Sequence, residues 1–405
     1  MRKWIGEDIC IIGNTHSFQT GIPSAFCPKE AAAPRRFHET IDSYEITPLV
    51  RLPELAKKLG IKEICVKDES KRFSLNAFKG LGGSYAMFRI LCEKLALDPE
   101  ATTLSELTSE YRNKIEQIEF VTCTDGNHGR GVSWAAGLFG CRAHVFMPCG
   151  SAEVRAEAIR QAGPADVVIT ELSYDDTVSL AKEMSEKHGW VLIQDTAWDD
   201  YEKIPIWIVQ GYLTLISEVT EQFEQLFVRP THVFLQAGVG AMAGGILGYL
   251  TEYYKEQKPV AVIVEPEDAD CIYSSAEAED GKIHSVDGIA HTMMAGLNCG
   301  TPCSITWPVL RDYAEFYCSC KDSVAAKGMR AYASGLNEDP VIVSGESGAA
   351  TLGAVISILT EEKLMELRTA MRLSSDSVIL LINTEGDTDP ENYQRVVLEN
   401  NTHIT

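Results

Sequence analysis

Short runs of β-branched and apolar residues alternate with longer stretches of helical periodicity along most of this chain. The apolar runs predict strands at 61–67, 119–123, 142–147, 166–170, 190–194, 231–236, 259–264 and 377–383. The periodic stretches predict helices at 80–95, 128–139, 151–162, 174–187, 206–226, 243–256, 322–334, 346–360 and 362–372. Several strands are apolar throughout, as strands buried on both faces of a parallel sheet should be. The alternation therefore predicts an α/β fold with largely parallel sheets covered by helices.

The first 46 residues depart from this alternation. They contain Pro23, Pro28 and Pro34 and no long periodic stretch, so we expect an irregular extension that wraps over a larger body. Their apolar run is interrupted by a glycine and two acidic residues, which does not suit a secretory signal peptide. No stretch of the sequence reaches the ~18 uncharged apolar residues that span a membrane. We therefore expect a cytoplasmic protein.

Composition narrows the range of partners. The 405 residues are 45% hydrophobic and 23% charged, which is typical of a globular protein. The formal net charge of −22 would repel phosphate backbones, so we expect no nucleic-acid partner. The twelve cysteines lack metal-ligand spacing with histidine, so we expect no metal site. One long-range disulfide, between Cys271 and Cys299, stays open on the sequence alone.

A glycine-rich turn follows a predicted strand in the segment 231–254, THVFLQAGVGAMAGGILGYLTEYY. Its glycines let backbone N–H groups converge at the start of a helix, which predicts a phosphate site. A dinucleotide is one ligand that fits, because Gly238 to Ala243 matches G-x-G-x-x-A and the next strand ends at Glu265, a carboxylate suited to ribose. A smaller cofactor that carries a phosphate is the other.

A lysine with unusual neighbours stands in LNAFKGLGG at residues 75–83. The three glycines that follow Lys79 predict that a flat ligand lies against the backbone there. The start of another predicted helix holds a polar loop formed by Thr124, Asp125, Gly126, Asn127 and His128. Asp125 suits a simple helix cap, but the glycines of this loop exceed what capping requires.

The lysine, the glycine turn, the asparagine and a hydroxyl at a strand end form one chemical set. A lysine amine forms a Schiff base with an aldehyde. A glycine turn binds a phosphate, an asparagine binds a ring oxygen, and a hydroxyl meets a ring nitrogen. Pyridoxal 5′-phosphate has all four groups. A dinucleotide would leave Lys79 and its glycines without a role.

With NAFKG, TDGNHGRGV and AGVGAMAGG in this order, the chain resembles the fold type II (tryptophan synthase β-like) pyridoxal phosphate enzymes from about residue 45 onward. Six ordered segments resemble the diaminopropionate ammonia-lyases in particular: VKDESKRFSLNAFKGLGG, TCTDGNHGRGVSWAA, IQDTAW, LQAGVGAMAGG, IVEPEDADCIY and LLINTEGDTD. The resemblance implies two three-layer α/β domains and a homodimer. The large cofactor-binding domain would comprise 1–87 and 201–405, and the small inserted domain 88–200.

The resemblance also assigns the cofactor contacts. Lys79 matches the Schiff-base lysine, Asn127 the asparagine at the cofactor's 3-hydroxyl oxygen, and Thr384 a hydroxyl opposite the pyridine nitrogen. The phosphate cradle corresponds to Gly238, Val239, Gly240 and Ala241. A hydroxyl partner does not force the pyridine nitrogen to be protonated. The ring is then a weaker electron sink, which suits β-elimination better than racemisation or transamination.

The expected substrate contacts centre on the residue before Gly-Asn-His. Threonine and serine dehydratases carry a small residue there, whereas this chain has Asp125. The resemblance implies that Asp125 takes the α-proton of a D-substrate, that Lys79 takes that of the L-isomer, and that Asp195 orients the substrate or assists D-isomer catalysis. The substrate carboxylate is expected near Thr124, Gly126 and His128.

The sequence therefore predicts a carbon–nitrogen lyase that depends on pyridoxal 5′-phosphate and acts on a small amino acid. The expected reaction is the α,β-elimination of D- and L-2,3-diaminopropionate to pyruvate and two ammonia. A serine or threonine dehydratase and an amino-acid racemase are alternatives with the same cofactor. An NAD-dependent oxidoreductase built on the glycine turn is a more remote alternative.

Overall fold

The computed structural model describes residues 1–16, 20–124, 126–286 and 292–398. The chain divides into two compact units. Unit 1 comprises Met1–Pro28, Ile46–Lys71 and Leu215–Thr405, and unit 2 comprises Lys29–Glu45 and Arg72–Thr214. This division groups residues 72–87 and 201–214 with the segment 88–200 that we expected to form the inserted domain.

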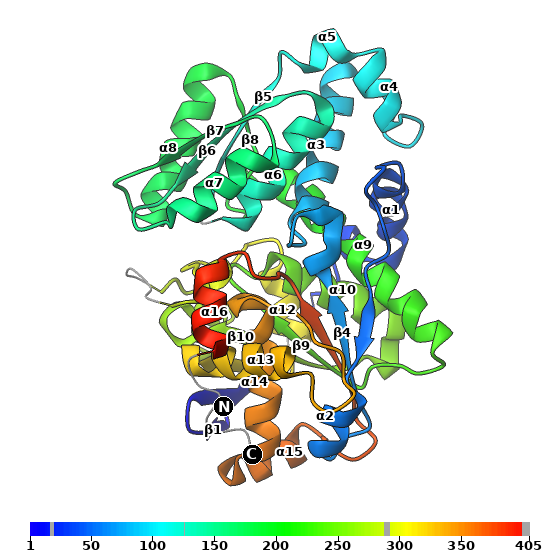
Figure 1. The fold of residues 1–405 in the computed structure, drawn as a ribbon, viewed down its shortest axis with the longest axis vertical. Helices are drawn as coiled ribbons and strands as arrows, with labels where there is room; N and C mark the ends of the chain where they lie inside the picture. Colours follow the sequence, from blue (N-terminus) through cyan, green and yellow to red (C-terminus); the bar gives the residue numbers. More distant parts are fainter. Residues whose placement is uncertain (17–19, 125, 287–291, 399–405) are drawn as a thin grey trace. The chain divides into compact units, whose positions relative to one another are not determined.

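Unit 1 is built on an eight-stranded sheet (Figure 1). In sheet order its strands are β1 (Lys3–Ile5), β2 (Ile9–Gly13), β11 (Phe316–Cys320), β10 (Val260–Pro266), β9 (His232–Gln236), β12 (Val378–Asn383), β4 (Glu63–Asp68) and β3 (Leu49–Arg51). The strands from β11 to β4 are parallel, and the pairs at both edges are antiparallel. Strands β9, β10 and β12 are buried along their whole length, which accounts for their continuous apolar sequences.

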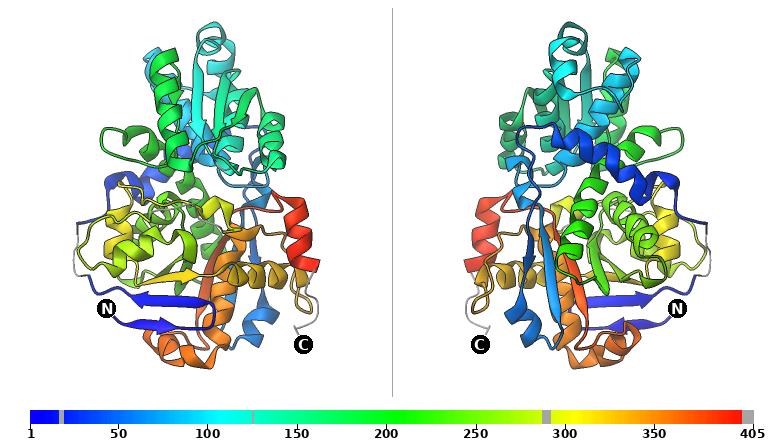
Figure 2. Two further views of the ribbon diagram at one scale, coloured as in Figure 1. Left: turned by 90° about the vertical axis from the view of Figure 1, so that its left-hand side faces the viewer. Right: turned by 90° about the vertical axis from the view of Figure 1, so that its right-hand side faces the viewer.

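The helices of unit 1 cover both faces of this sheet (Figure 2). They are α2 (Pro53–Lys58), α10 (Ala241–Tyr254), α11 (Cys271–Glu277), α12 (Trp307–Tyr313), α13 (Asp322–Ser334), α14 (Glu346–Thr360), α15 (Met365–Ala370) and α16 (Pro390–Leu398). Helices α13 and α14 pack closely: a Cβ on Gly353 would lie only 1.8 Å from the carbonyl oxygen of Val324. Together they bury the core over one sheet face.

Unit 2 is built on a smaller, fully parallel sheet. In sheet order its strands are β7 (Ala165–Ile169), β6 (Arg142–Met147), β5 (Glu119–Cys123) and β8 (Val191–Leu192). Its helices are α1 (Ala32–Glu39), α3 (Gly80–Leu95), α4 (Leu104–Ser109), α5 (Arg112–Ile115), α6 (Asn127–Phe139), α7 (Glu153–Ala162) and α8 (Tyr174–His188). Helix α8 covers one sheet face while α6 and α7 cover the other, and α9 (Lys203–Gln225) contributes to both units (Figures 1 and 2).

The predicted strands and helices are all present, with ends that shift by a few residues. The predicted strand at 190–194 is shortened to Val191–Leu192, and the predicted helix at 362–372 narrows to a short 3₁₀ turn followed by α15. The predicted α/β class with largely parallel sheets is confirmed. No helix of the described residues is long and apolar enough to cross a membrane.

The expectation that the first 46 residues are irregular is wrong. Strands β1 and β2 extend the unit 1 sheet, because β2 pairs with β11 some 300 positions later, Ile11 lying opposite Cys318. In unit 2, helix α1 buries Phe37, whose ring stacks on Phe88 at 4.4 Å between centroids. These elements are short, so their order depends on distant partners rather than on local periodicity.

Candidate active site

The predicted phosphate turn lies between β9 and α10, at the carboxyl edge of the unit 1 sheet. Gly240 has a φ of +83° and is the N-cap of α10. No side chain caps α10 and its first turn holds no acidic residue, so its backbone N–H groups and positive dipole end suit an anion. A Cβ on Gly240 would lie 2.7 Å from the side chains of Ile272 and Leu310. Glycine is therefore required here, and the turn fits the phosphate of pyridoxal 5′-phosphate.

Thr384 lies at the same sheet edge because β9 and β12 are parallel neighbours, with Leu381 opposite Phe234. Gln236, the last residue of β9, donates from Nε2 to Thr384 Oγ1 at 3.0 Å. The same amide nitrogen donates to the carbonyl oxygen of Ile382 at 2.8 Å. Sequence reasoning missed Gln236, although a glutamine that ends an apolar strand beside a glycine turn is a recognisable signal.

In unit 2, Lys79 is the residue from which α3 begins, and its Nζ donates to Asp195 Oδ2. The Lys79 and Asp195 side chains are 19% and 10% exposed. The Nζ atom also lies 5.4 Å from the ring centroid of Phe78 and 5.9 Å from that of Tyr212. Two aromatic rings and a carboxylate thus hold the amine in a mostly buried position.

The charge of Asp195 depends on its neighbours. Burial raises the pKa of Asp195, but the nearby His128 and Lys79 and the hydrogen bond from Lys79 outweigh burial and lower this pKa to about 2. Burial lowers the pKa of His128. His128 Nε2 lies 2.9 Å from the carbonyl oxygen of Ile193, which only accepts, so this nitrogen carries the proton of the neutral ring. Lys79 therefore contributes a positive charge and a hydrogen bond that help to keep Asp195 ionised.

The glycines after Lys79 are packed by the protein itself. A Cβ on Gly82 would lie 2.6 Å from the Tyr212 ring, and one on Gly83 would lie 3.3 Å from the backbone of Gly131 in α6. The expectation that these glycines accommodate a flat ligand is therefore wrong. They allow α3 to approach α6 and α9 closely, and so they fix the backbone that carries the lysine.

The polar loop before α6 is organised by a threonine. Thr124 Oγ1 accepts hydrogen bonds from the backbone N–H groups of Gly126 at 3.0 Å and Gly129 at 3.1 Å. Thr124 thus caps the start of the helix by accepting from its backbone N–H groups. The sequence had suggested Asp125 for this capping role. Asn127 is the first residue of α6. Asp125 itself lies outside the described residues.

The structure gives Glu265 a role that excludes it as a ribose ligand. Its carboxylate accepts from the backbone N–H groups of Ile272 at 2.8 Å and Tyr273 at 2.7 Å, and it is fully buried. Glu265 therefore satisfies the first turn of α11. The dinucleotide alternative therefore loses the carboxylate that was expected to bind its ribose.

Within the described residues no disulfide joins Cys271 and Cys299.

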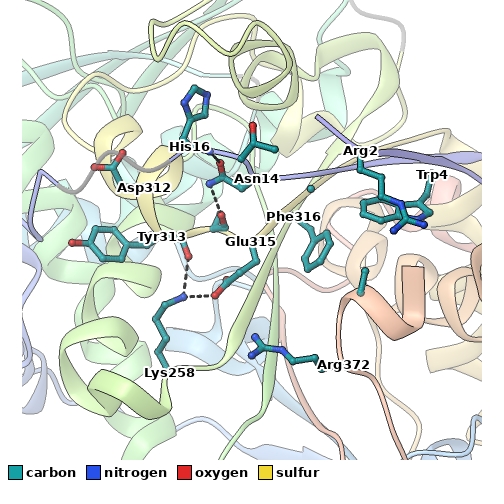
Figure 3. Close-up of a pocket in the computed structure, with 14 residues that line it drawn as sticks. Arg2, Trp4, Asn14, His16, Lys258, Asp312, Tyr313, Glu315, Phe316 and Arg372 are labelled. Carbon is teal, nitrogen blue, oxygen red and sulfur yellow. Dashed lines mark hydrogen bonds and ion pairs between the residues drawn. The ribbon is translucent and has the colours of Figure 1, made fainter. Parts of the chain in front are cut away.

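A pocket of about 520 Å³ opens elsewhere in unit 1, beside β2 and β11 (Figure 3). None of the described residues predicted for the site lines it. Its Lys258 donates to Glu315 and to the carbonyl oxygen of Tyr313, and its Arg2 pairs with Glu366. Because carboxylates already neutralise these two cations, we assign the pocket no part in the reaction.

Comparison with known proteins places the chain in a family. A family model described as pyridoxal-phosphate dependent enzyme matches residues 41–385. The chain therefore belongs to the pyridoxal-phosphate dependent enzymes, with the fold of type II. It is 49% identical to diaminopropionate ammonia-lyase of Escherichia coli K12 over 92% of each chain, and 48% identical to that of Salmonella typhimurium over 89% of this chain and 90% of the relative. Within the class it belongs to the diaminopropionate ammonia-lyase family.

Solved structures agree with this assignment. The holo diaminopropionate ammonia lyase of Escherichia coli matches with a TM-score of 0.91 at 47% identity, covering 98% of both chains. The same enzyme in complex with D-serine matches equally well, again at 47% identity and 98% of both chains. Its complex with an aminoacrylate-PLP azomethine reaction intermediate matches with a TM-score of 0.90 at 46% identity over the same shares.

The paired charges of Lys79 and Asp195 give a prediction for the apoprotein. Lys79→Met should lower the free energy of unfolding at pH 7 by ~3 kcal/mol, because it leaves a mostly buried carboxylate without its cation. The pKa of Asp195 should rise from about 2, since burial then dominates. Urea denaturation and carboxyl ¹³C NMR measure the two effects.

The sign of the pH dependence follows from the lowered pKa. In the wild type the carboxylate contributes stability above its unfolded pKa of about 3.9, and this contribution is lost as the pH falls toward about 2. In Lys79→Met the sign reverses: once burial raises the folded-state pKa of Asp195 above the unfolded value, the ionised carboxylate destabilises the fold, so stability should increase as the pH falls through that raised pKa. The double variant Lys79→Met/Asp195→Asn should regain most of the stability, and an unchanged titration of Asp195 in Lys79→Met would contradict the pairing.

Proposed function

We propose that this protein eliminates ammonia from 2,3-diaminopropionate, D and L, to give pyruvate and a second ammonia. The observation that carries the proposal is the match to diaminopropionate ammonia-lyases over nine tenths of the chain. The chemistry balances: diaminopropionate and one water contain the atoms of pyruvic acid and two ammonia. The lyase class and its dependence on pyridoxal phosphate follow from the family.

Several of the residues predicted from the sequence would hold the cofactor. Lys79 would bind its aldehyde carbon, Asn127 its 3-hydroxyl oxygen and Thr384 its pyridine nitrogen. The phosphate would lie on the backbone N–H groups of the turn formed by Gly238, Val239, Gly240 and Ala241. When bound, pyridoxal phosphate supplies an electron-withdrawing ring that acidifies the Cα–H bond of an attached amino acid. The uncapped start of α10 and the buried amine of Lys79 support this arrangement.

The two proton acceptors would act on opposite isomers. Lys79 would take the α-proton of the L-isomer and Asp125 that of the D-isomer. Loss of the β-amine as ammonia then leaves aminoacrylate, which water hydrolyses to pyruvate and the second ammonia. The Asp195 carboxylate is ionised and mostly buried, so the extra ammonium of diaminopropionate is a suitable replacement for the Lys79 ammonium beside it. Asp195 would thereby orient the substrate or assist D-isomer turnover.

The substrate carboxylate would lie against the start of α6. Thr124, Gly126 and His128 are within this loop, and His128 adds no positive charge because burial lowers its pKa. The N–H groups of the helix start would therefore be the main donors to the carboxylate. A dehydratase for serine or threonine, or a racemase, would use the same cofactor contacts but would not need the second ammonium site at Asp195.

We further propose a homodimer that works in the cytoplasm. Homodimers are usual among fold type II enzymes, and the −22 charge suits a freely dissolved protein. Sedimentation of the purified protein at twice the mass of one chain is the expected result. Sedimentation at the mass of a single chain would contradict the dimer.

Covalent attachment at Lys79 gives the central prediction. The purified protein should absorb near ~410 nm, as expected of a Schiff base between a lysine and pyridoxal phosphate. Borohydride should abolish this band and fix the cofactor on the peptide that contains Lys79. Lys79→Ala should lack the band and lose at least ~10³-fold in kcat, the scale for a lost covalent or acid–base group.

Product analysis tests the reaction itself. Diaminopropionate should yield pyruvate and ammonia in a ratio of one to two, with serine and threonine as comparison substrates. A ratio of one to one from serine, with no turnover of diaminopropionate, would favour a dehydratase. Inversion without release of ammonia would favour a racemase.

The carboxylate at position 125 gives an isomer-specific prediction. Asp125→Asn should lower kcat for D-diaminopropionate by ~10²-fold or more, while kcat for the L-isomer falls far less, because only the D-isomer presents its α-proton to this side chain. Pyruvate formation from each isomer measures the two rates. Equal losses on both isomers would exclude Asp125 as the D-specific base.

A further inference from the structure

The hydrogen bond between Gln236 and Thr384 lies outside the roles assigned so far. Gln236 is 2% exposed and Thr384 is 5% exposed, and Nε2 of Gln236 donates to Thr384 Oγ1 at 3.0 Å. We propose that Gln236 is a positioning residue that orients the Thr384 hydroxyl as a hydrogen-bond donor toward the cofactor ring. This inference rests on the proposed function, since it concerns the residue expected to meet the pyridine nitrogen.

The orientation of the Gln236 amide is fixed by chemistry. Its Nε2 lies 2.8 Å from the carbonyl oxygen of Ile382, which can only accept a hydrogen bond. A flipped amide would place two bare oxygens against each other in a buried site, at a cost of a few kcal/mol. Both protons of Nε2 are therefore used, one on Ile382 and one on Thr384. The glutamine acts as a donor to Thr384 and not as an acceptor.

This assignment determines the direction of the Thr384 hydroxyl. A hydroxyl oxygen that already accepts from Gln236 keeps its own proton for another acceptor. Among the described residues, no recorded hydrogen bond takes that proton, and Thr384 is at the carboxyl edge of the sheet where ligands bind. A pyridine nitrogen that meets this hydroxyl would accept its proton in a hydrogen bond, and only an unprotonated nitrogen can do so.

The neighbouring contacts hold both partners in place. Asn383, which precedes Thr384, donates from Nδ2 to Asp68 Oδ1 at 2.8 Å and to the carbonyl oxygen of Val343 at 3.1 Å. Gln236 ends β9, a strand that is buried throughout. Gln236 would thereby keep the ring a moderate electron sink, which favours loss of the β-amine over transamination.

A spectroscopic experiment tests this proposal in the holoenzyme. The protein is reconstituted with pyridoxal phosphate labelled with ¹⁵N in the ring, and the ¹⁵N chemical shift reports whether the ring nitrogen is protonated. We expect an unprotonated shift in the wild type and a shift toward the protonated value in Gln236→Glu, whose carboxylate accepts from Thr384. The fraction of turnovers that end in pyridoxamine phosphate should rise about tenfold, the change in population that one pKa unit represents.

Three variants separate positioning from a structural effect. Thr384→Val removes the hydroxyl, so Gln236→Glu should add no further change of shift in the Thr384→Val background if Gln236 acts through Thr384. Gln236→Met removes the donor without adding a charge, and it carries the test if Gln236→Glu does not fold. Gln257→Glu repeats the chemical change on the surface and should leave the shift and the product ratio at wild-type values.

Two results would overturn the inference. One is a wild-type shift and product ratio in both Gln236→Glu and Gln236→Met. The other is an effect of Gln236→Glu that persists unchanged in the Thr384→Val background. Failure of the proposed function looks different, because the wild type would then lack the band near ~410 nm or release no pyruvate from diaminopropionate.

Discussion

The parallel pairing of β9 with β12 is the constraint on which the candidate site residues of unit 1 depend. Because both strands run in one direction and lie side by side, the residues after Gln236 and after Asn383 emerge at the same sheet edge. The glycine turn and Thr384 are separated by more than a hundred residues in sequence, yet the register makes them neighbours. A shift of one position along β12 would exchange the faces of its side chains and remove Thr384 from the reach of Gln236.

The candidate site residues of unit 2 depend on the balance of buried charge around Lys79. A buried ammonium and a buried carboxylate are each costly alone, and their contact offsets most of the two desolvation terms. The same contact means that the ionisation of Asp195 depends on the state of the Lys79 amine. Under the proposed function, a cofactor on the Lys79 nitrogen would leave Asp195 as an ionised, mostly buried group. A substrate with a second ammonium would then supply the missing charge, whereas serine has no second ammonium.

Much of the fold could be predicted from the sequence because long apolar strands and periodic helices carry local signals. Strands such as β12 and helices such as α13 were predictable for this reason. Strands β1 and β2 were not, since their order comes from pairing with β11 at the other end of the chain. The position of Gln236 at the end of an apolar strand was recognisable in the sequence, but its contact with Thr384 was not, because long-range hydrogen bonds leave no periodic pattern in a sequence.

The glycines show where residue type alone misleads. Near Lys79 and at the turn after β9, the same cluster of small residues suggested the same purpose, close approach of a ligand. The space beside Gly82 and Gly83 is instead filled by Tyr212 and by the backbone of Gly131. Gly240, in contrast, is required by a left-handed turn at an uncapped helix start. The two groups of glycines act differently. Those after Lys79 fix the lysine through tight helix packing, and the one at the turn leaves backbone N–H groups open for an anion.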